Sequence, residues 1–169
     1  VITRFNGEEV ALKVIAPGSE ARLIENLDTM KRSLAGTGEE GELLAALIDG
    51  IRAISAQEAD LRIEADSMRR AAAMAPYGTR VPGVRYADRN VLIMEVAKGR
   101  RVDQVALAPR DRARAARKLI VNVLDSIGRQ GFFHGDLHPG NVMILPGNTI
   151  CLLDYGIVGR PDDSLKNFL

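Results

Sequence analysis

A loop and a strand end near the C-terminus of the chain carry side chains suited to phosphate and metal chemistry. The loop reads His134-Gly135-Asp136-Leu137-His138-Pro139-Gly140-Asn141, and a short hairpin leads from it to Asp154-Tyr155-Gly156. Phosphoryl transfer needs a carboxylate near the acceptor and oxygen ligands for Mg²⁺, and Asp136, Asn141 and Asp154 supply these groups in protein-kinase order. The two motifs therefore predict the phosphate-and-metal end of a protein-kinase-like ATP site.

A lysine and a glutamate from the first half of the chain are expected to complete this site. Lys13 lies in the apolar stretch 10–14, where a charged side chain that points inward needs a partner. Kinase-like sites place a phosphate-binding lysine on such a strand and pair it with a glutamate from a neighbouring helix. Glu64 shares a helical face with apolar residues and is the best candidate, whereas Glu58 and Asp60 taken alone are more typical of a solvated face.

The elements that position these residues are predicted from turn residues and hydrophobic periodicity. Asn6-Gly7 predicts a hairpin between strands at residues 2–5 and 10–15. Apolar residues at helical spacing predict a helix over residues 23–34 and a longer helical stretch from 44 to about 73, with a joint near Gly50 or Ser55. Two short strands are expected next, at residues 84–86 and 91–94.

The C-terminal part of the chain is predicted to hold one long helix and a second hairpin. The helix covers residues 109–129, and the hairpin strands cover 142–145 and 149–153. The inner face of the helix is expected to carry Ala116, Leu119, Ile120, Val123 and Ile127. The resulting fold class is α+β and protein-kinase-like. Residues 1–97 would form a small antiparallel N-lobe sheet with a helical insertion at about 19–56, and residues 98–169 would begin a helical C-lobe.

Composition and charge argue against several classes of partner and location. The net charge of +1 argues against nucleic acid as an obligatory partner, because nucleic-acid-binding domains carry a clear basic excess. A single cysteine, Cys151, excludes an internal disulfide and fits a reducing compartment. No apolar run approaches the ~20 residues needed to span a bilayer. We therefore expect a cytoplasmic protein, with any membrane association made through other parts of a longer parent protein.

Four features of the chain occur together in one protein family. They are Ala11-Leu12-Lys13-Val14 leading into Pro17-Gly18, the helical insertion, the spacing Glu58-x-Asp60-x-x-x-Glu64, and residues 131–141. With these features the chain resembles the aarF-domain/UbiB group of atypical kinases. Residues 153–160 are similar as well, with Tyr155 where the family usually has Phe, so the resemblance covers nearly the whole chain.

This resemblance implies a role for each candidate residue. Lys13 would bind the nucleotide phosphates and pair with Glu64, while Asp136 would be the catalytic-loop aspartate. Asn141 and Asp154 would hold Mg²⁺. The hinge that contacts adenine would consist of Met94, Glu95 and Val96. The family's Glu-x-Asp signature would correspond to Glu58 and Asp60.

The resemblance also implies a function, for which alternatives stay open. We expect an ATP-binding kinase or ATPase that uses Mg-ATP and supports ubiquinone or other isoprenoid-lipid metabolism. The expected partners are the nucleotide, a lipid or isoprenoid-quinone precursor and a peripheral membrane surface. A small-molecule phosphotransferase of the aminoglycoside or choline kinase type is one alternative, and a pseudokinase-like nucleotide-binding module is another. Because the family's nucleotide-covering loop would precede Val1, the chain is expected to be a piece of a longer protein.

Overall fold

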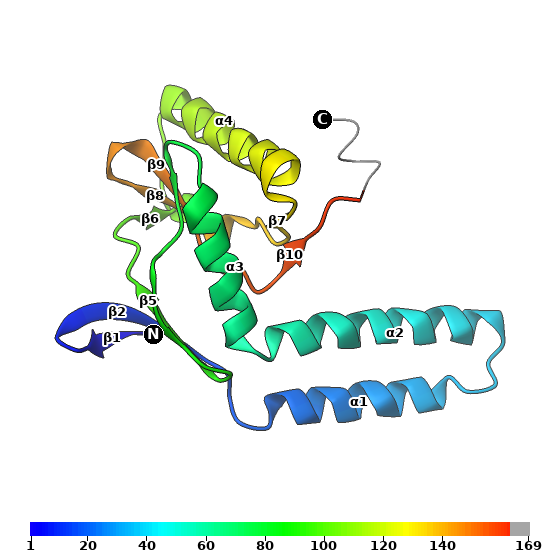
Figure 1. The fold of residues 1–169 in the computed structure, drawn as a ribbon. Coiled ribbons are helices and arrows are strands. Elements are labelled where there is room, and N and C mark those ends of the chain that lie inside the picture. The colour runs from blue at the N-terminus through cyan, green and yellow to red at the C-terminus, as the bar shows by residue number, and fades with distance from the viewer. Residues whose placement is uncertain (163–169) are drawn as a thin grey trace.

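Two four-stranded sheets, a pair of two-residue strands and four α-helices make up the described part of the chain (Figure 1). The computed structural model describes residues 1–162, apart from the side chains of residues 56–58 and 130. The strands are β1 (Ile2–Phe5), β2 (Glu8–Val14), β3 (Thr79–Arg80), β4 (Val84–Ala87), β5 (Val91–Glu95), β6 (Arg100–Arg101), β7 (Phe133–His134), β8 (Val142–Leu145), β9 (Thr149–Leu152) and β10 (Val158–Gly159). The helices are α1 (Ser19–Ser33), α2 (Glu39–Glu58), α3 (Leu61–Met74) and α4 (Pro109–Asp125), with a π-helical turn at Ser126–Gln130.

The first sheet is antiparallel and has the strand order β1-β2-β5-β4. The predicted hairpin is present, and its turn residues Asn6 and Gly7 have φ angles of 50° and 84°. Two successive positive φ angles give a turn whose twist matches that of the strands. Strand β2 pairs with β1 on one side and with β5 on the other, and Lys13 lies opposite Leu92 on β5. This register fixes the position of Lys13 in the interior of the sheet.

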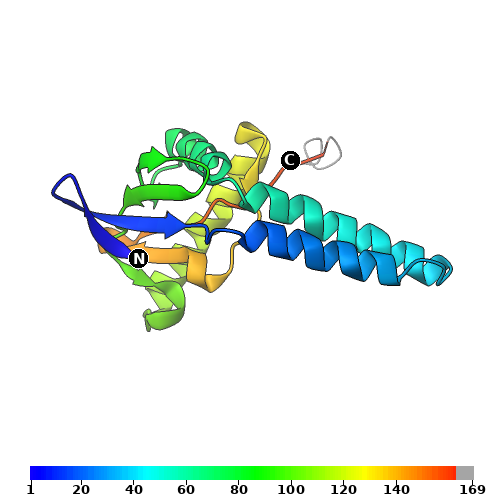
Figure 2. The same ribbon diagram turned by 90° about the horizontal axis from the view of Figure 1, so that it is seen from below.

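An antiparallel pair of helices, α1 and α2, connects β2 to α3 and projects from one side of the molecule (Figures 1 and 2). The joint expected near Gly50 or Ser55 is wrong, because α2 runs without interruption from Glu39 to Glu58. A helix interior tolerates one glycine at a cost of about 0.5–1 kcal/mol relative to alanine. The break comes at Ala59 instead, where the Asp60 carboxylate accepts the Arg62 N–H and caps the next helix.

The second sheet has the order β3-β9-β8-β6 and contains the predicted hairpin of β8 and β9. Strand β3 was not foreseen, because two residues are too few to show a periodic pattern. It runs parallel to β9, with Thr79 opposite Ile150 and Arg80 opposite Cys151. The segment before β4 is thus hydrogen-bonded to the sheet that carries the end of the metal motif.

Helix α4 begins at Pro109 as predicted, but the expected inner face is partly wrong. Ala115 and Asn122 are its buried residues, and Ser126 is buried in the turn that follows. Ile120 is exposed, whereas Leu119 is partly buried against the core. The Asn122 amide approaches the Thr79 hydroxyl at 3.5 Å, so the buried face of the helix includes a polar residue that was not among those predicted.

The hydrophobic core lies around α3, between the two sheets (Figure 1). Leu61, Ala65 and Met68 on α3 are almost completely buried, as are Leu92 on β5 and Leu152 on β9. Helix α3 packs against β4 and β5 of the first sheet, and its buried side chains belong to the same hydrophobic cluster as Ile150 and Leu152 of the second sheet. The buried face that carries Glu64 is therefore part of the core that joins the two sheets. Among the described residues, no helix has both the length and the apolar character needed to cross a membrane.

Candidate functional site

The two halves of the chain meet at Lys13. Its Nζ donates hydrogen bonds to Glu64 Oε2 at 2.8 Å and to Asp154 Oδ1 at 2.9 Å. Strand β2 supplies the lysine, α3 supplies Glu64, and the segment after β9 supplies Asp154. Residues 141 positions apart in sequence are therefore joined by one ammonium group. The sequence predicted the pairing of Lys13 with Glu64 but not its contact with Asp154.

Glu64 is the most buried member of this group, with 3% of its side chain exposed, against 37% for Lys13. Within the described part of the chain, its Oε1 atom is buried and receives no hydrogen bond. Burial raises the pKa of Glu64 above its usual value, and the hydrogen bond and charge of Lys13 oppose that rise only in part. The glutamate thus holds Lys13 in place without fully offsetting its own desolvation.

The other two members of the group are stabilised in their charged forms. Burial alone would lower the pKa of Lys13, but hydrogen bonds and charges from Glu64 and Asp154 outweigh burial and raise it. Burial alone would also raise the pKa of Asp154, but the hydrogen bond and charge of Lys13 lower it below the usual value. A lysine and an aspartate that stay ionised are the groups needed to contact phosphate and metal.

The loop from His134 to Asn141 is held by hydrogen bonds between side chains and backbone. The His134 Nε2 atom lies 2.7 Å from the carbonyl oxygen of Leu153, and its Nδ1 accepts the Asp136 N–H at 3.2 Å. The Asn141 amide nitrogen donates to the carbonyl oxygen of Asp136 at 3.0 Å. Histidine and asparagine therefore fix the backbone on both sides of Asp136 and tie this loop to the residue before Asp154.

Asp154 and Gly156 form a turn beside the lysine. Asp154 has a φ of 56°, a left-handed conformation that aspartate tolerates better than most residues. The Gly156 N–H points at Asp154 Oδ1 from 3.3 Å. A Cβ at position 156 would lie only 3.2 Å from the same oxygen, so glycine permits this approach. Tyr155 is buried between them, with its ring centre 4.7 Å from that of His134.

Two adjoining cavities meet at Lys13, Glu64 and Asp154. The first, of about 270 Å³, also contacts Asp60, Asp136 and Gly156. The second, of about 330 Å³, is lined by Ala11 on β2, by Met94 on β5 and by Val96, which follows β5. Together they offer a charged end and an apolar end, which is the division required by a nucleotide triphosphate and its base.

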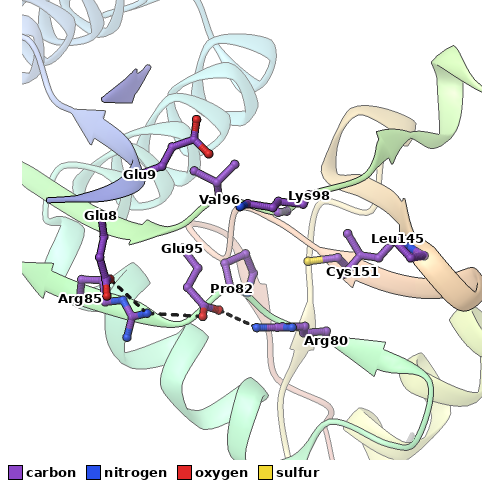
Figure 3. Close-up of a pocket in the computed structure, with 12 residues that line it drawn as sticks. Glu8, Glu9, Arg80, Pro82, Arg85, Glu95, Val96, Lys98, Leu145 and Cys151 are labelled. Carbon is purple, nitrogen blue, oxygen red and sulfur yellow. Dashed lines mark hydrogen bonds and ion pairs between the residues drawn. The ribbon is translucent and has the colours of Figure 1, made fainter. Parts of the chain in front are cut away.

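A third and larger cavity, of about 540 Å³, is also bordered by the segment 95–97 (Figure 3). The Glu95 carboxylate takes part here, accepting the Gly83 N–H at 3.0 Å and an Arg80 hydrogen bond at 2.9 Å. Arg85 lies 3.6 Å from both Glu95 and Glu8, which completes a row of alternating charges visible in Figure 3. Glu95 therefore borders both this cavity and the one beside Lys13, and its carboxylate ties the segment to Gly83 and Arg80.

The oxygen atoms of Asn141 and Asp154 fit a magnesium ion of the kind bound with nucleotides. Asn141 uses its amide nitrogen to contact Asp136, so its Oδ1 stays available as a ligand. Asp154 uses Oδ1 for Lys13 and Gly156, which leaves Oδ2 for a cation. The described residues contain no group of three His, Cys, Asp or Glu side chains able to hold a metal ion by themselves. Mg²⁺ matches this sparse set because it takes most of its ligands from water and phosphates.

Most of the predicted site residues therefore come together. Lys13, Glu64, Asp136 and Asp154 surround one cavity with Asp60, and Asn141 borders the adjoining one. The Glu58 backbone ends α2, and its side chain lies outside the described residues. Ala11 and Met143 were not predicted as lining residues. Ala11 was accessible to sequence reasoning, because it lies two residues before Lys13 and so faces the same side of the strand.

A comparison with protein families agrees with this arrangement. The model of the ABC1 atypical kinase-like domain matches residues 2–169. The chain belongs to the ABC1 atypical kinase-like family. This membership confirms the atypical-kinase resemblance inferred from the sequence, and the fold is accordingly kinase-like.

Individual relatives of this ABC1-type chain come from bacteria and plants. Rv0647c of Mycobacterium tuberculosis, an uncharacterized protein, is 33% identical over 178 residues, which cover 95% of this chain and 36% of the relative. The chloroplastic protein ACTIVITY OF BC1 COMPLEX KINASE 8 of Arabidopsis thaliana is 27% identical, with 98% of this chain and 24% of the relative covered. The chain thus spans about a third or less of the length of these curated relatives.

A solved structure shows the same fold. The complex of Rv3197 with erythromycin, from Mycobacterium tuberculosis, superimposes with a TM-score of 0.75 at 26% sequence identity. The match covers 96% of this chain and 42% of the Rv3197 chain. The fold shared with Rv3197 therefore extends over essentially all of the sequence.

Proposed function

We propose that this chain is the ATP-binding core of an atypical kinase or ATPase of the aarF/UbiB type, which uses Mg-ATP. The observation that carries the proposal is the contact of Lys13 with both Glu64 and Asp154 beside a cavity lined by Asp136. Lys13 would neutralise phosphate oxygens, and Asp154 with Asn141 would hold Mg²⁺. The metal supplies positive charge to the polyphosphate when bound.

The roles of the remaining residues follow from their positions in the same cavities. Asp136 is fixed through its backbone by His134 and Asn141 and lines the cavity beside Lys13, where its carboxylate would contact an acceptor hydroxyl or water. Ala11, Met94 and Val96 line the apolar end and would contact the base. Glu64 would hold Lys13 in position through the hydrogen bond to Oε2.

The test of this proposal is nucleotide binding and hydrolysis by the purified chain and by two site variants. A fluorescent ATP analogue should bind in the presence of Mg²⁺, and Lys13→Ala and Asp154→Asn should each weaken binding or hydrolysis at least tenfold. Arg52→Ala, which removes an exposed ion pair to Asp28 on the helical pair, serves as the matched control and should bind normally. Unchanged binding and unchanged hydrolysis in both site variants would show that the proposed site is wrong.

We further propose that the physiological role belongs to ubiquinone or other isoprenoid-lipid metabolism, at a membrane surface in the cytoplasm. This part rests on the family resemblance alone. The phosphoryl acceptor would be a lipid or isoprenoid-quinone precursor. It is tested by adding isoprenoid-quinone precursors to the hydrolysis reaction and measuring transfer of the γ-phosphoryl group, where water as the sole acceptor would identify an ATPase.

A binding module without phosphoryl transfer is the second candidate function. It is favoured by the Rv3197 relative, whose solved structure is a complex with erythromycin. For this chain the two functions differ in a simple measurement. Tight Mg-ATP binding without hydrolysis or transfer would favour the binding module, whereas turnover that depends on Asp136 would favour the enzyme.

A further inference from the structure

The helical pair α1 and α2 carries an apolar surface that the rest of the described chain leaves uncovered. It projects away from both sheets (Figures 1 and 2). Leu27 and Ile48 are buried where the two helices contact each other. Leu43, near the start of α2, is 73% exposed. Six further large apolar side chains stay 41–60% exposed and form the surface considered below: Leu23, Met30, Leu44, Leu47, Ile51 and Ile54.

These exposed residues follow the spacing of a helix-packing seam. On α2 they recur at intervals of three, four and three residues, and on α1 Leu23 and Met30 are seven residues apart. On both helices they are rotated in the same sense from the buried contact residues. Because α1 and α2 are antiparallel, a rotation in the same sense brings both sets to the same side of the pair. The pair therefore presents a two-helix apolar layer, which is half of a four-helix bundle.

The two charged side chains in the middle of α2 pair with side chains on α1. Asp49 on α2 pairs with Lys31 at 2.6 Å, and Arg52 pairs with Asp28 at 2.6 Å. Asp49 and Arg52 are the only charged residues in the α2 segment 43–54. Since both bind partners on α1, the middle of the apolar layer carries no charge that would oppose an incoming helix.

We propose that this layer packs against the same layer of a second copy, so that two helical pairs form an isologous four-helix bundle. Two copies satisfy the requirement of a two-fold interface, because each contributes the same apolar rows. The six side chains expose on the order of 500 Å² per copy, so two copies would bury about 1,000 Å² if all six were fully covered, which is at the lower limit for a specific interface and fits a weak dimer.

A lipid bilayer is a poorer occupant of this surface. Residues 19–58 contain eight acidic and four basic side chains, for a net charge of −4, and no aromatic residue. Interfacial membrane helices carry the opposite pattern, with lysine and arginine on the polar face and tryptophan or phenylalanine on the apolar face. The charge pattern therefore favours a protein surface, and the matched apolar rows favour a second copy.

Sedimentation equilibrium of the 169-residue chain and of one variant tests the proposal. The wild-type chain should behave as a dimer that dissociates on dilution. Leu47→Glu should raise the dimer dissociation constant at least tenfold, because each copy would place a charge in the apolar layer. Its far-ultraviolet circular dichroism should stay unchanged, since Leu47 is an exposed side chain.

Two matched variants and a lipid assay separate the alternatives. Ala53→Glu adds the same charge to an exposed part of α2 outside the six-residue layer and should leave the dimer intact. Three outcomes would overturn the proposal: a monomeric wild-type chain, a dimer lost on Ile120→Glu in α4 and kept on Leu47→Glu, or flotation with phosphatidylcholine–phosphatidylglycerol vesicles that Leu47→Glu abolishes. None of these measurements involves nucleotide, so they leave the proposed ATP site untouched.

Discussion

At the residue scale, the structure shows one ammonium group shared by two carboxylates of unequal burial. Glu64 is deeply buried and only partly satisfied, while Asp154 is half exposed and stays ionised. A phosphate that replaces one of these contacts would take the Asp154 side, because the cavity opens there, and leave the Glu64 contact intact. The glutamate therefore acts on the nucleotide through the lysine.

Removing Lys13 should destabilise the fold as well as the site. In Lys13→Ala the buried Glu64 loses its hydrogen-bond donor, and we expect a loss of about 1–3 kcal/mol in the free energy of unfolding. Urea denaturation at neutral pH measures it. The double variant Lys13→Ala/Glu64→Gln should recover part of that loss, because no buried carboxylate stays unpaired. Additive effects of the two substitutions would contradict the coupling.

His134 should make the stability of the chain depend on pH. Its Nδ1 accepts the Asp136 N–H, so the folded chain requires the neutral ring with the proton on Nε2. Burial lowers the pKa of His134 below its usual value of 6.5, despite the nearby carbonyl and carboxylates. The unfolded chain takes up the proton first. Stability is therefore complete above pH 6.5 and decreases as the pH falls from 6.5 through the lower folded-state pKa.

Urea melts between pH 7.5 and 5.5 check this dependence. His134→Gln should be less stable at every pH but should flatten the curve in that interval. His138→Gln is the matched substitution at the other histidine of the chain, whose side chain is 54% exposed. A slope that follows His138 in place of His134 would exclude the assignment.

At the scale of elements, Asp60 has a structural role that its place in a family signature does not reveal. It caps α3 by accepting the Arg62 N–H, and its side chain also bonds the Arg62 guanidinium. The hydrogen bonds from Arg62 lower the pKa of Asp60 to about 2. The cap sets where α3 begins and hence where Glu64, one turn later, enters the core.

Substitutions at Asp60 should separate the cap from the charge. Asp60→Ala should cost about 0.5–2 kcal/mol of stability in chemical denaturation, which is the usual value of an N-cap. Asp60→Asn keeps an oxygen acceptor, so it should cost only about a few tenths of a kcal/mol in the free energy of unfolding. If Asp60→Asn nevertheless changes nucleotide affinity, the residue acts on the ligand by its charge. Equal stability of the unsubstituted chain, Asp60→Ala and Asp60→Asn would contradict the capping role.

Sequence reasoning succeeded where local pattern and tertiary structure agree. The hairpin at Asn6-Gly7, the lysine strand and the buried face of α3 follow from turn chemistry and periodicity, and they determine the core of the site. It failed where packing overrides pattern. Asn122 is buried although it is polar, and Ile120 is exposed although it is apolar. Strand β3 has only two residues and depends on its pairing with β9, which lies far away in the sequence. The largest of the three cavities described above, which Glu95 borders, also depends on contacts between segments that are distant in the sequence.

At the scale of the whole molecule, nucleotide should stabilise both sheets together. Lys13 comes from one sheet and Asp154 from the end of the other, so a ligand held by both should raise the global melting temperature. Mass action predicts about 2.7 kcal/mol at a ligand concentration one hundred times the dissociation constant. Thermal denaturation with ATP and Mg²⁺ measures this shift.

The metal is tested in the same experiment. ATP with EDTA should give a smaller increase in melting temperature than Mg-ATP, and Asp154→Asn should remove that difference. An increase of equal size with and without Mg²⁺ would argue that Asn141 and Asp154 do not hold a cation. A parallel series with erythromycin, the ligand in the Rv3197 complex, measures whether this compound also raises the melting temperature.

The helical pair also has a mechanical consequence. Helix α1 begins six residues after Lys13, and α2 ends six residues before Glu64, so a short segment joins each end of the helical pair to one partner of this ion pair. A movement of the pair that reached both segments would change the separation of lysine and glutamate. If the nucleotide binds best at one position of the helical pair, a second copy that holds the pair in that position would raise the affinity for nucleotide. By thermodynamic reciprocity, the nucleotide would raise the affinity for the second copy by the same factor. The tendency of the chain to self-associate and its affinity for nucleotide would then rise and fall together.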